Sequence, residues 1–93
     1  MRFDWDDEKA GANIRKHMGV TFEEAESVFG DPLARIFEDD AHSHGEKRNA
    51  IFGHSDQNRL LIVSYTEREN DTIRIISARP ATPKEARRYA NQT

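Results

Sequence analysis

The sequence contains no cysteine, which excludes disulfide bonds and zinc sites built from thiolates. It has no apolar run near the roughly 20 residues that a membrane helix needs, and residues 1–10 lack the apolar segment of a signal peptide. Only 35% of the 93 residues are hydrophobic, against 33% that are charged. Together these features predict one small cytoplasmic domain, residues 1–93, without a membrane partner.

Acidic side chains are scarce in the second half of the chain. Residues 1–46 carry twelve acidic and five basic side chains, whereas residues 47–93 carry five acidic and nine basic ones. Such asymmetry, in a chain whose net charge is −3, is typical of proteins with a basic binding surface. The same arginines can instead pair with acids of the first half, so composition leaves both interpretations open.

A helix is expected to begin after Asp6 in "DWDDEKAGANIRKHM". Asp6 can cap the helix, and the acids behind it suit the positive end of the helix dipole. Ala10, Ile14 and Met18 recur at four-residue spacing and predict a thin apolar face.

Two further helices are indicated by capping boxes, in which a Thr and a Glu three residues later cap each other's backbone. The first is formed by Thr21 and Glu24 in "TFEEAESVFGDP". The second is formed by Thr82 and Glu85 in "TPKEARRYANQT", with Pro83 at the first helical position.

The remaining apolar segments predict strands joined by short polar turns. Short turns favour an antiparallel meander for the last four of them, and the order of elements indicates an α+β domain. The expected strands are residues 2–5, 33–37, 47–55, 59–67 and 72–79.

Arginines stand out on the last strand, "TIRIISAR". Strict alternation places Arg74 and Ala78 on one face, and Ser77 and Arg79 on the other. An arginine within an isoleucine-rich strand is costly unless it is paired or faces an open groove. These residues are therefore candidates for a binding surface.

Other polar side chains can reach the same rim. Glu46 and Arg48 share one face of their strand, and Tyr65 and Arg68 lie towards the end of the next one. Arg88 follows on the C-terminal helix. Such a set suits phosphate binding, because arginine presents a rigid fork of donors and tyrosine can stack on a base.

The chemistry that this set favours is cleavage of RNA without a metal ion. That reaction needs a base for the ribose 2′-OH, cations for the charged transition state and an acid for the leaving 5′ oxygen. Glu46 is a candidate base, and Lys16 or His17 is a candidate acid. Ion pairs that merely hold the meander together explain the same arginines.

A different reading starts from His42 and His44, two residues apart in an acidic loop. Imidazoles and carboxylates can bind a metal ion, so a metal-dependent nuclease is an alternative. Pairs of this kind are more often part of a solvated loop. We therefore expect neither a metal site nor a cofactor.

The sequence resembles the BrnT family of toxins from bacterial type II toxin–antitoxin systems. The resemblance spans nearly the whole chain and is carried by "FDWDDEKAGANIRKH", "GVTFEEAESVF", "GEKR", "LLIVSYTER" and "IRIISARPATPKEARRYA". It implies a RelE-like fold, in which a small antiparallel sheet packs on the two N-terminal helices and is followed by a C-terminal helix. It also implies RNA held on the other side of the sheet.

The resemblance further implies an endoribonuclease toxin and its partners. These are an RNA substrate and a BrnA-like antitoxin with a ribbon-helix-helix domain, through which the complex, including an antitoxin dimer, would reach operator DNA. The family's basic motif residues fall on Lys16, His17, Arg48 and Arg79, with Glu46 beside them. The residues in matching segments are Arg68, Arg74, Arg88 and Tyr89.

One departure from the family pattern concerns Met18, which lengthens the usual K-H-G-V to "KHMGV". The extra residue can move Lys16 or His17 relative to the strands. It supports an alternative function: a toxin homologue without catalysis, which acts with its antitoxin as a binding module in operator autoregulation.

Overall fold

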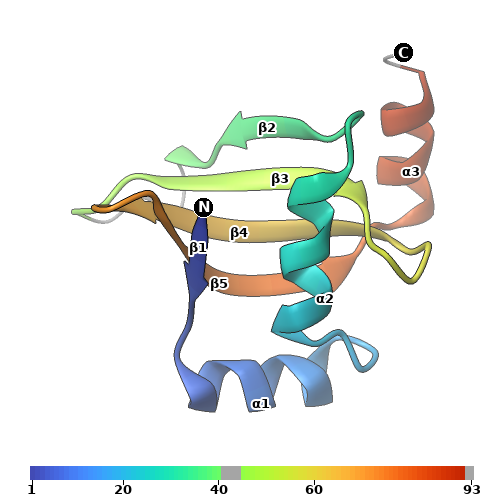
Figure 1. Cartoon of the computed structure of the whole chain (residues 1–93). Coiled ribbons are helices and arrows are strands. Elements are labelled where there is room, and N and C mark those ends of the chain that lie inside the picture. The colour runs from blue at the N-terminus through green and yellow to red at the C-terminus, as the bar shows by residue number, and fades with distance from the viewer. Residues whose placement is uncertain (41–44, 92–93) are drawn as a thin grey trace.

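The computed structural model describes residues 1–40 and 45–91 and has an α+β fold, as the sequence predicts (Figure 1). Its strands form one five-stranded sheet in the order β1-β5-β4-β3-β2. The elements in chain order are β1 (Arg2–Asp4), α1 (Asp7–Lys16), α2 (Phe22–Ser27), a 3₁₀ turn (Val28–Gly30), β2 (Arg35–Glu38), β3 (Arg48–His54), β4 (Leu60–Arg68), β5 (Thr72–Pro80) and α3 (Pro83–Ala90).

The sheet is mixed rather than purely antiparallel. Strands β2 to β5 form the predicted antiparallel meander. Strand β1 adds to the free edge of β5 in parallel, with Phe3 opposite Ile73. A parallel pair needs a long connection between its strands, and here α1, α2 and strands β2 to β4 provide it.

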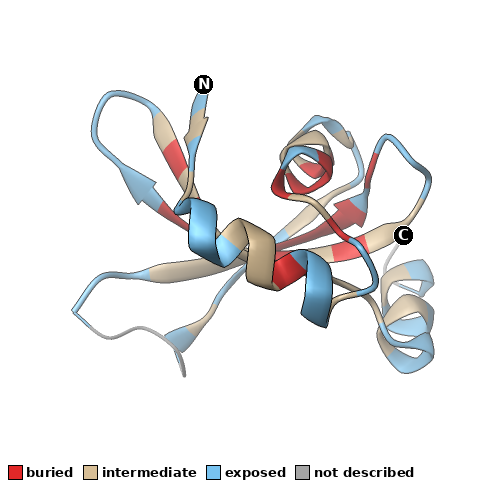
Figure 2. Cartoon of the chain, turned by 90° about the horizontal axis from the view of Figure 1, so that it is seen from below, coloured by how far each residue is buried: buried red, intermediate tan, exposed pale blue. Residues whose placement is uncertain are grey.

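Helices α1 and α2 lie on one side of the sheet, and the core fills the space between them and the strands (Figures 1 and 2). The short α2 contributes Phe22 and Ala25, which are fully buried. They pack with apolar side chains of the sheet that point to the same side, namely Ile51, Leu61, Val63, Tyr65, Ile73, Ile75 and Ala78. None of the helices that the structure describes is long and apolar enough to span a membrane.

The apolar face predicted for α1 is wrong at two of its three residues. Ala10 packs against the core, but Ile14 is 44% exposed and Met18 is 79% exposed, and Asn13 is the buried residue of this helix. The Asn13 amide donates to the carbonyls of Val20 and Ala78 at 3.0 and 2.8 Å and accepts from the Ala78 N–H at 3.0 Å. A polar residue faces inward because it satisfies the edge of β5 beyond the end of β1, where a buried backbone group needs a partner.

The extra residue Met18 is absorbed by a left-handed turn. Met18 and the following Gly19 have φ angles of 56° and 77°. The Arg59 guanidinium donates to the Met18 carbonyl at 3.1 Å, which ties this corner to the turn between β3 and β4. The insertion therefore changes the corner after α1 without entering the sheet.

Glu24 has a different role from the one predicted. Thr21 caps α2 by accepting from the Glu24 N–H at 3.0 Å. The Glu24 carboxylate is buried and pairs with Arg59 while accepting from the Ser55 hydroxyl at 2.7 Å. Hydrogen bonds from Arg59 lower the pKa of Glu24. This ion pair holds the β3–β4 turn against α2.

A β-bulge in the β4–β5 pairing corrects the predicted faces of β5. The register shifts between Ser64 and Tyr65, so that Ser64 lies opposite Ser77 and Tyr65 lies opposite Ile75. A bulge inserts one extra residue and therefore inverts the alternation beyond it. Ala78 consequently joins the core, and Arg79 comes to the other face of the sheet.

Candidate functional site

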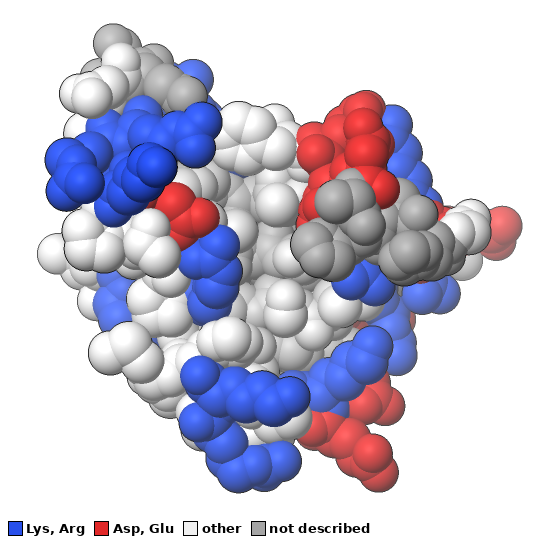
Figure 3. Space-filling view, turned by 180° about the vertical axis from the view of Figure 1, so that it is seen from behind, with Lys and Arg blue, Asp and Glu red and all other residues white. Residues whose placement is uncertain are grey.

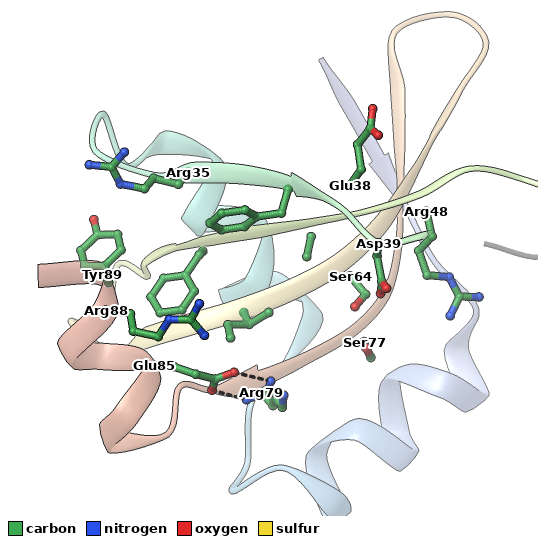
Figure 4. A pocket seen from close by; sticks show the side chains of 14 residues that line it. Arg35, Glu38, Asp39, Arg48, Ser64, Ser77, Arg79, Glu85, Arg88 and Tyr89 are labelled. Carbon is green, nitrogen blue, oxygen red and sulfur yellow. Dashed lines mark hydrogen bonds and ion pairs between the residues drawn. The ribbon is translucent and has the colours of Figure 1, made fainter. Parts of the chain in front are cut away.

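A cavity of about 550 Å³ opens on the face of the sheet opposite the core (Figure 4). Volumes in this range are typical of ligand sites. Side chains from β2 and the residue after it, from β3, β4 and β5, and from α3 surround it: Arg35, Phe37, Glu38, Asp39, Arg48, Ala50, Phe52, Ile62, Ser64, Ser77, Arg79, Glu85, Arg88 and Tyr89.

The floor of the cavity is a row of small side chains that crosses the sheet. Ala50 lies opposite Ser64, and Ser64 lies opposite Ser77 in the next strand. Phe37 of the edge strand β2 lies opposite Ala50 and closes one end of the row. Because neighbouring side chains on one face of a sheet stand side by side, the small residues leave a trench between the larger rows that flank it.

Arg79 lies in one flanking row and is held by Glu85 of α3. Its Nη1 and Nη2 atoms donate to Glu85 Oε1 and Oε2 at 2.8 and 2.9 Å. Glu85 also completes the predicted capping box with Thr82, whose N–H donates to Oε1 at 2.9 Å. Hydrogen bonds from Arg79 lower the pKa of Glu85 to about 2. At neutral pH the pair is therefore fully ionised and bidentate.

Tyr89 fixes the other end of α3. Its ring stacks on Phe52 with centroids 5.1 Å apart and an interplanar angle of 11°. Its hydroxyl lies 3.3 Å from Asp31 Oδ2 and 3.2 Å from the Leu33 carbonyl. Burial raises the pKa of Tyr89, so the hydroxyl keeps its proton. Helix α3, which buries no residue completely, is thus anchored at both ends beside the cavity.

Basic and acidic side chains both border the cavity. Figure 3, which views this face, shows Lys and Arg side chains grouped over α3 and towards α1, and an acidic group on the side away from α3, around a centre of uncharged side chains. Glu38 and Asp39 are the acids that line the cavity at the β2 end. The last turn of α3 supplies Arg87 and Arg88. Arg48 and Arg79 lie on opposite sides of Ser64 and Ser77 (Figure 4). This arrangement can bind an extended anion across the trench.

Four of the residues predicted from the sequence come together in this cavity, namely Arg48, Arg79, Arg88 and Tyr89. Lys16 and His17, at the end of α1, are not among the residues that line it. The acid–base candidates at this corner therefore do not line the cavity that contains Arg48 and Arg79.

Glu46 also lies elsewhere. Its carboxylate pairs with Arg68 at 3.1 Å, and both line a second hollow near the far end of β4. Arg74 pairs with Asp4 at 3.3 Å outside the main cavity.

Tyr65 needs a correction. It is 2% exposed and packs edge-on against Phe29 in the core, with centroids 5.1 Å apart. Burial raises its pKa. Its role in this structure is packing rather than contact with a substrate.

Several residues of the cavity were not singled out from the sequence, although the sequence contains a pattern that marks them. Arg48, Ala50 and Phe52 alternate along β3, and Ser64 interrupts an apolar run in β4. A small polar residue in such a run indicates an open position on the sheet. Glu85 was assigned only to its cap, because its contact with Arg79 depends on how α3 docks.

The histidine-based metal site lies outside the described residues, since residues 41–44 are not among them. Across residues 1–40 and 45–91, no group of three or more His, Asp or Glu side chains is arranged to hold a metal ion.

Comparison with known families identifies the chain. Residues 5–85 match the family described as "Ribonuclease toxin, BrnT, of type II toxin-antitoxin system". The chain belongs to the BrnT family. The resemblance drawn from its sequence motifs is therefore confirmed.

A solved BrnT structure supports the fold. The chain is similar to the crystal structure of the Brucella abortus ribonuclease toxin BrnT, with 23% sequence identity and a TM-score of 0.67, over 88% of this chain and 97% of the other. No curated protein sequence gives a significant match. The three α-helices described and the five-stranded mixed sheet thus form a BrnT-like fold.

Proposed function

We propose that this BrnT-family protein is a cytoplasmic endoribonuclease toxin that cleaves RNA by acid–base catalysis without a metal ion. The observation that carries the proposal is the cavity in which Arg48 and Arg79 approach a floor of small side chains from opposite sides. The family name, which describes a ribonuclease toxin, supports it.

Arg79 is proposed to stabilise the phosphate that reacts. Its guanidinium already makes two parallel hydrogen bonds to a carboxylate, and a phosphate presents oxygens that fit the same fork. A bound phosphate would therefore take the place of Glu85. Arg48 on the opposite side would hold the chain of the substrate by a second contact.

Glu85 is then a candidate for the base. While Arg79 holds it, the pKa of Glu85 is about 2, which makes the carboxylate a weak base at neutral pH. Once the phosphate displaces it, that pKa rises towards its ordinary value, and the carboxylate is a better acceptor for the 2′-OH proton.

Glu46, Lys16 and His17 remain the alternatives that the sequence suggests for acid and base. Their positions outside the cavity lining give the two versions of the mechanism opposite predictions. Substitution of Glu85 impairs cleavage in the first version, and substitution of Glu46, Lys16 or His17 does so in the second.

The proposed partner is a BrnA-like antitoxin that inhibits the toxin and carries a ribbon-helix-helix domain. The type II toxin–antitoxin family supports an antitoxin partner and an RNA substrate. The complex would reach operator DNA through the antitoxin. We also propose that the domain shares the RelE-like architecture, with its substrate on the sheet face opposite α1 and α2.

The test is cleavage of a single-stranded RNA by purified protein in the presence of EDTA. Degradation that continues in EDTA and ends in 2′,3′-cyclic phosphate products is expected, because the 2′-OH is the nucleophile. Intact RNA after incubation with folded protein, with and without ribosomes, contradicts the proposal. Cleavage that EDTA abolishes contradicts metal independence alone.

A second candidate function is that of a non-catalytic binding module, which acts with the antitoxin in operator autoregulation. The observations in its favour are that Arg79 is engaged by Glu85 and that Lys16, His17 and Glu46 do not line the cavity. It predicts normal growth when the chain is expressed alone. Growth arrest that is relieved by the antitoxin favours the toxin.

A further inference from the structure

We propose that the β2 end of the cavity binds an unpaired RNA base, which stacks on the ring of Phe37. This inference rests on the proposed function, because it assigns a subsite to the same cavity. It adds the form of the substrate, a single strand with at least one base turned out of any stack, and the residue that recognises it.

Phe37 is an exposed aromatic residue that lines the cavity. It is 46% exposed, because β2 is a short strand of four residues at the edge of the sheet. Its cross-strand neighbour is Ala50, which is too small to cover the ring. An open aromatic face beside a trench is a site where a flat apolar ligand gains contact area.

A rigid aromatic wall stands next to this position. Phe52 follows Ala50 on the same face of β3 and is covered by the stacked ring of Tyr89. The hydroxyl contacts of Tyr89 with Asp31 and Leu33 keep that ring in place. The wall is therefore formed before any ligand arrives, which lowers the entropic cost of binding.

Basic side chains occupy the positions that a phosphodiester backbone would need. Arg79 and Arg88 line the cavity on the side of β5 and α3, and Arg48 lines it on the other side. The trench from Ser77 to Phe37 crosses four strands, about 14 Å at the usual strand spacing. Phosphate and base contacts are thus separate, as in proteins that bind single strands by cationic grooves and aromatic platforms.

The arrangement favours a single strand over a duplex. In an A-form helix both faces of each base are covered by its neighbours, and recognition relies on shape and on the 2′-OH. A ring at the end of a trench can stack only on a base that has left the helix. Phe37 therefore selects loops, ends and unpaired segments.

The experiment measures binding of short fluorescein-labelled 2′-O-methyl strands, which cannot be cut because the 2′ oxygen is blocked. One strand carries all its bases, and a matched strand has abasic positions. The wild-type chain is expected to bind the base-bearing strand about 5- to 150-fold more tightly, the range for stacking of one base. Phe37→Leu should remove this preference while leaving the affinity for the abasic strand unchanged, and Phe37→Trp should keep it.

Ile36→Ala is the matched control. Ile36 is the next residue of the same edge strand and is 62% exposed, but it lies opposite Ile51 on the other face of the sheet. Its substitution should leave both affinities unchanged. Thermal unfolding of each variant, followed by circular dichroism, verifies that the fold is intact.

Equal binding of the two strands by the wild type, or an unchanged preference in Phe37→Leu, overturns the subsite. If Phe37→Leu loses binding to a purified antitoxin but keeps its preference for the base-bearing strand, the subsite is also overturned. Phe37 then belongs to a protein interface. Cleavage of an unmodified strand is scored separately. If the protein prefers the base-bearing strand but does not cleave RNA, the subsite is supported and the proposed ribonuclease activity is contradicted. If the protein cleaves RNA without this preference, the ribonuclease activity is supported and the subsite is contradicted.

Discussion

Arg79 of β5 and Glu85 of α3 face each other in a bidentate ion pair with donor–acceptor distances of 2.8 and 2.9 Å. The pair joins the sheet to the helix that flanks the cavity, and it also places a carboxylate next to the arginine proposed to bind phosphate. The same contact is thus structural in the free protein and is the one that a substrate would have to replace.

The pH dependence of stability should report this pair. The pKa of Glu85 falls from 4.5 to about 2 in the folded protein, so its stabilisation is present above pH 4.5 and is lost as the pH falls towards 2. We expect Glu85→Gln, which preserves the cap, to cost about 1–2 kcal/mol at neutral pH after allowance for partial exposure. Urea unfolding should show this difference shrinking with acidification. A difference that is constant with pH contradicts the assignment.

Arg79 and Arg74 lie on the same strand and give a matched pair of variants. We expect Arg79→Ala to lower kcat/KM for RNA cleavage by about 100-fold or more, because it removes a donor pair from the transition state. Arg74→Ala should change it by less than about 3-fold, since Arg74 pairs with Asp4 outside the cavity. Steady-state cleavage of a labelled RNA measures both. An equal loss of kcat/KM in the two variants would show that Arg74 also contributes to the candidate site.

The floor of the trench can be filled from Ala50. Ala50→Leu places a bulky side chain between Phe37 and Ser64, and we expect cleavage and RNA binding to fall by about tenfold or more while the free energy of unfolding changes by less than about 1 kcal/mol. Ala50→Ser resembles the flanking serines and serves as the control. Unchanged activity in Ala50→Leu would show that the substrate does not cross this floor.

Asn13 tests how α1 packs. Removal of its amide in Asn13→Ala leaves the N–H and C=O groups of Ala78 without their side-chain partner, and we expect a loss of about 2–4 kcal/mol. Ile14→Ala, on the residue that the sequence pattern assigned to the core, should cost less than about 1 kcal/mol because Ile14 is largely exposed. Chemical denaturation measures the free energy of unfolding of both variants. A larger loss for Ile14→Ala than for Asn13→Ala would support the apolar face that the sequence pattern predicts.

The corner after α1 offers a conformational test. Met18 is a non-glycine residue with positive φ, a conformation that costs about 1–2 kcal/mol for a side chain of this kind. Met18→Gly should therefore stabilise the protein by up to about 1 kcal/mol once the greater freedom of the unfolded chain is counted. Gly19→Ala, at a φ of 77° with no neighbour near the added methyl group, should destabilise it. Thermal melting distinguishes the two.

The order and type of the elements followed from local signals. Asp6, Thr21 and Thr82 cap the three helices as expected, and the short polar turns led to an antiparallel meander. These features could be predicted because capping and hairpin formation depend on residues that are close in the sequence. The family motifs are local in the same sense, and they identified the chain.

The long-range partners could not be predicted, because each depends on docking between distant segments. Asn13 meets Ala78 only when α1 packs along β5, and Glu24 meets Arg59 only when the β3–β4 turn folds onto α2. Asn13 and Glu24 are polar and would be costly to bury alone, but their partners make burial favourable. Their places in the interior therefore depend on contacts that local sequence does not show.

The family, the α+β class and a basic set that includes Arg48, Arg79 and Arg88 can all be derived from the residues in order. Which members of that set share a cavity depends on how the chain folds. One bulge opposite Ser64 brings Arg79 to the open face, and the docking of α3 places Glu85 against it. A single inserted residue inverts every side chain beyond it, so the face of an arginine on β5 is a property of strand pairing and not of the strand.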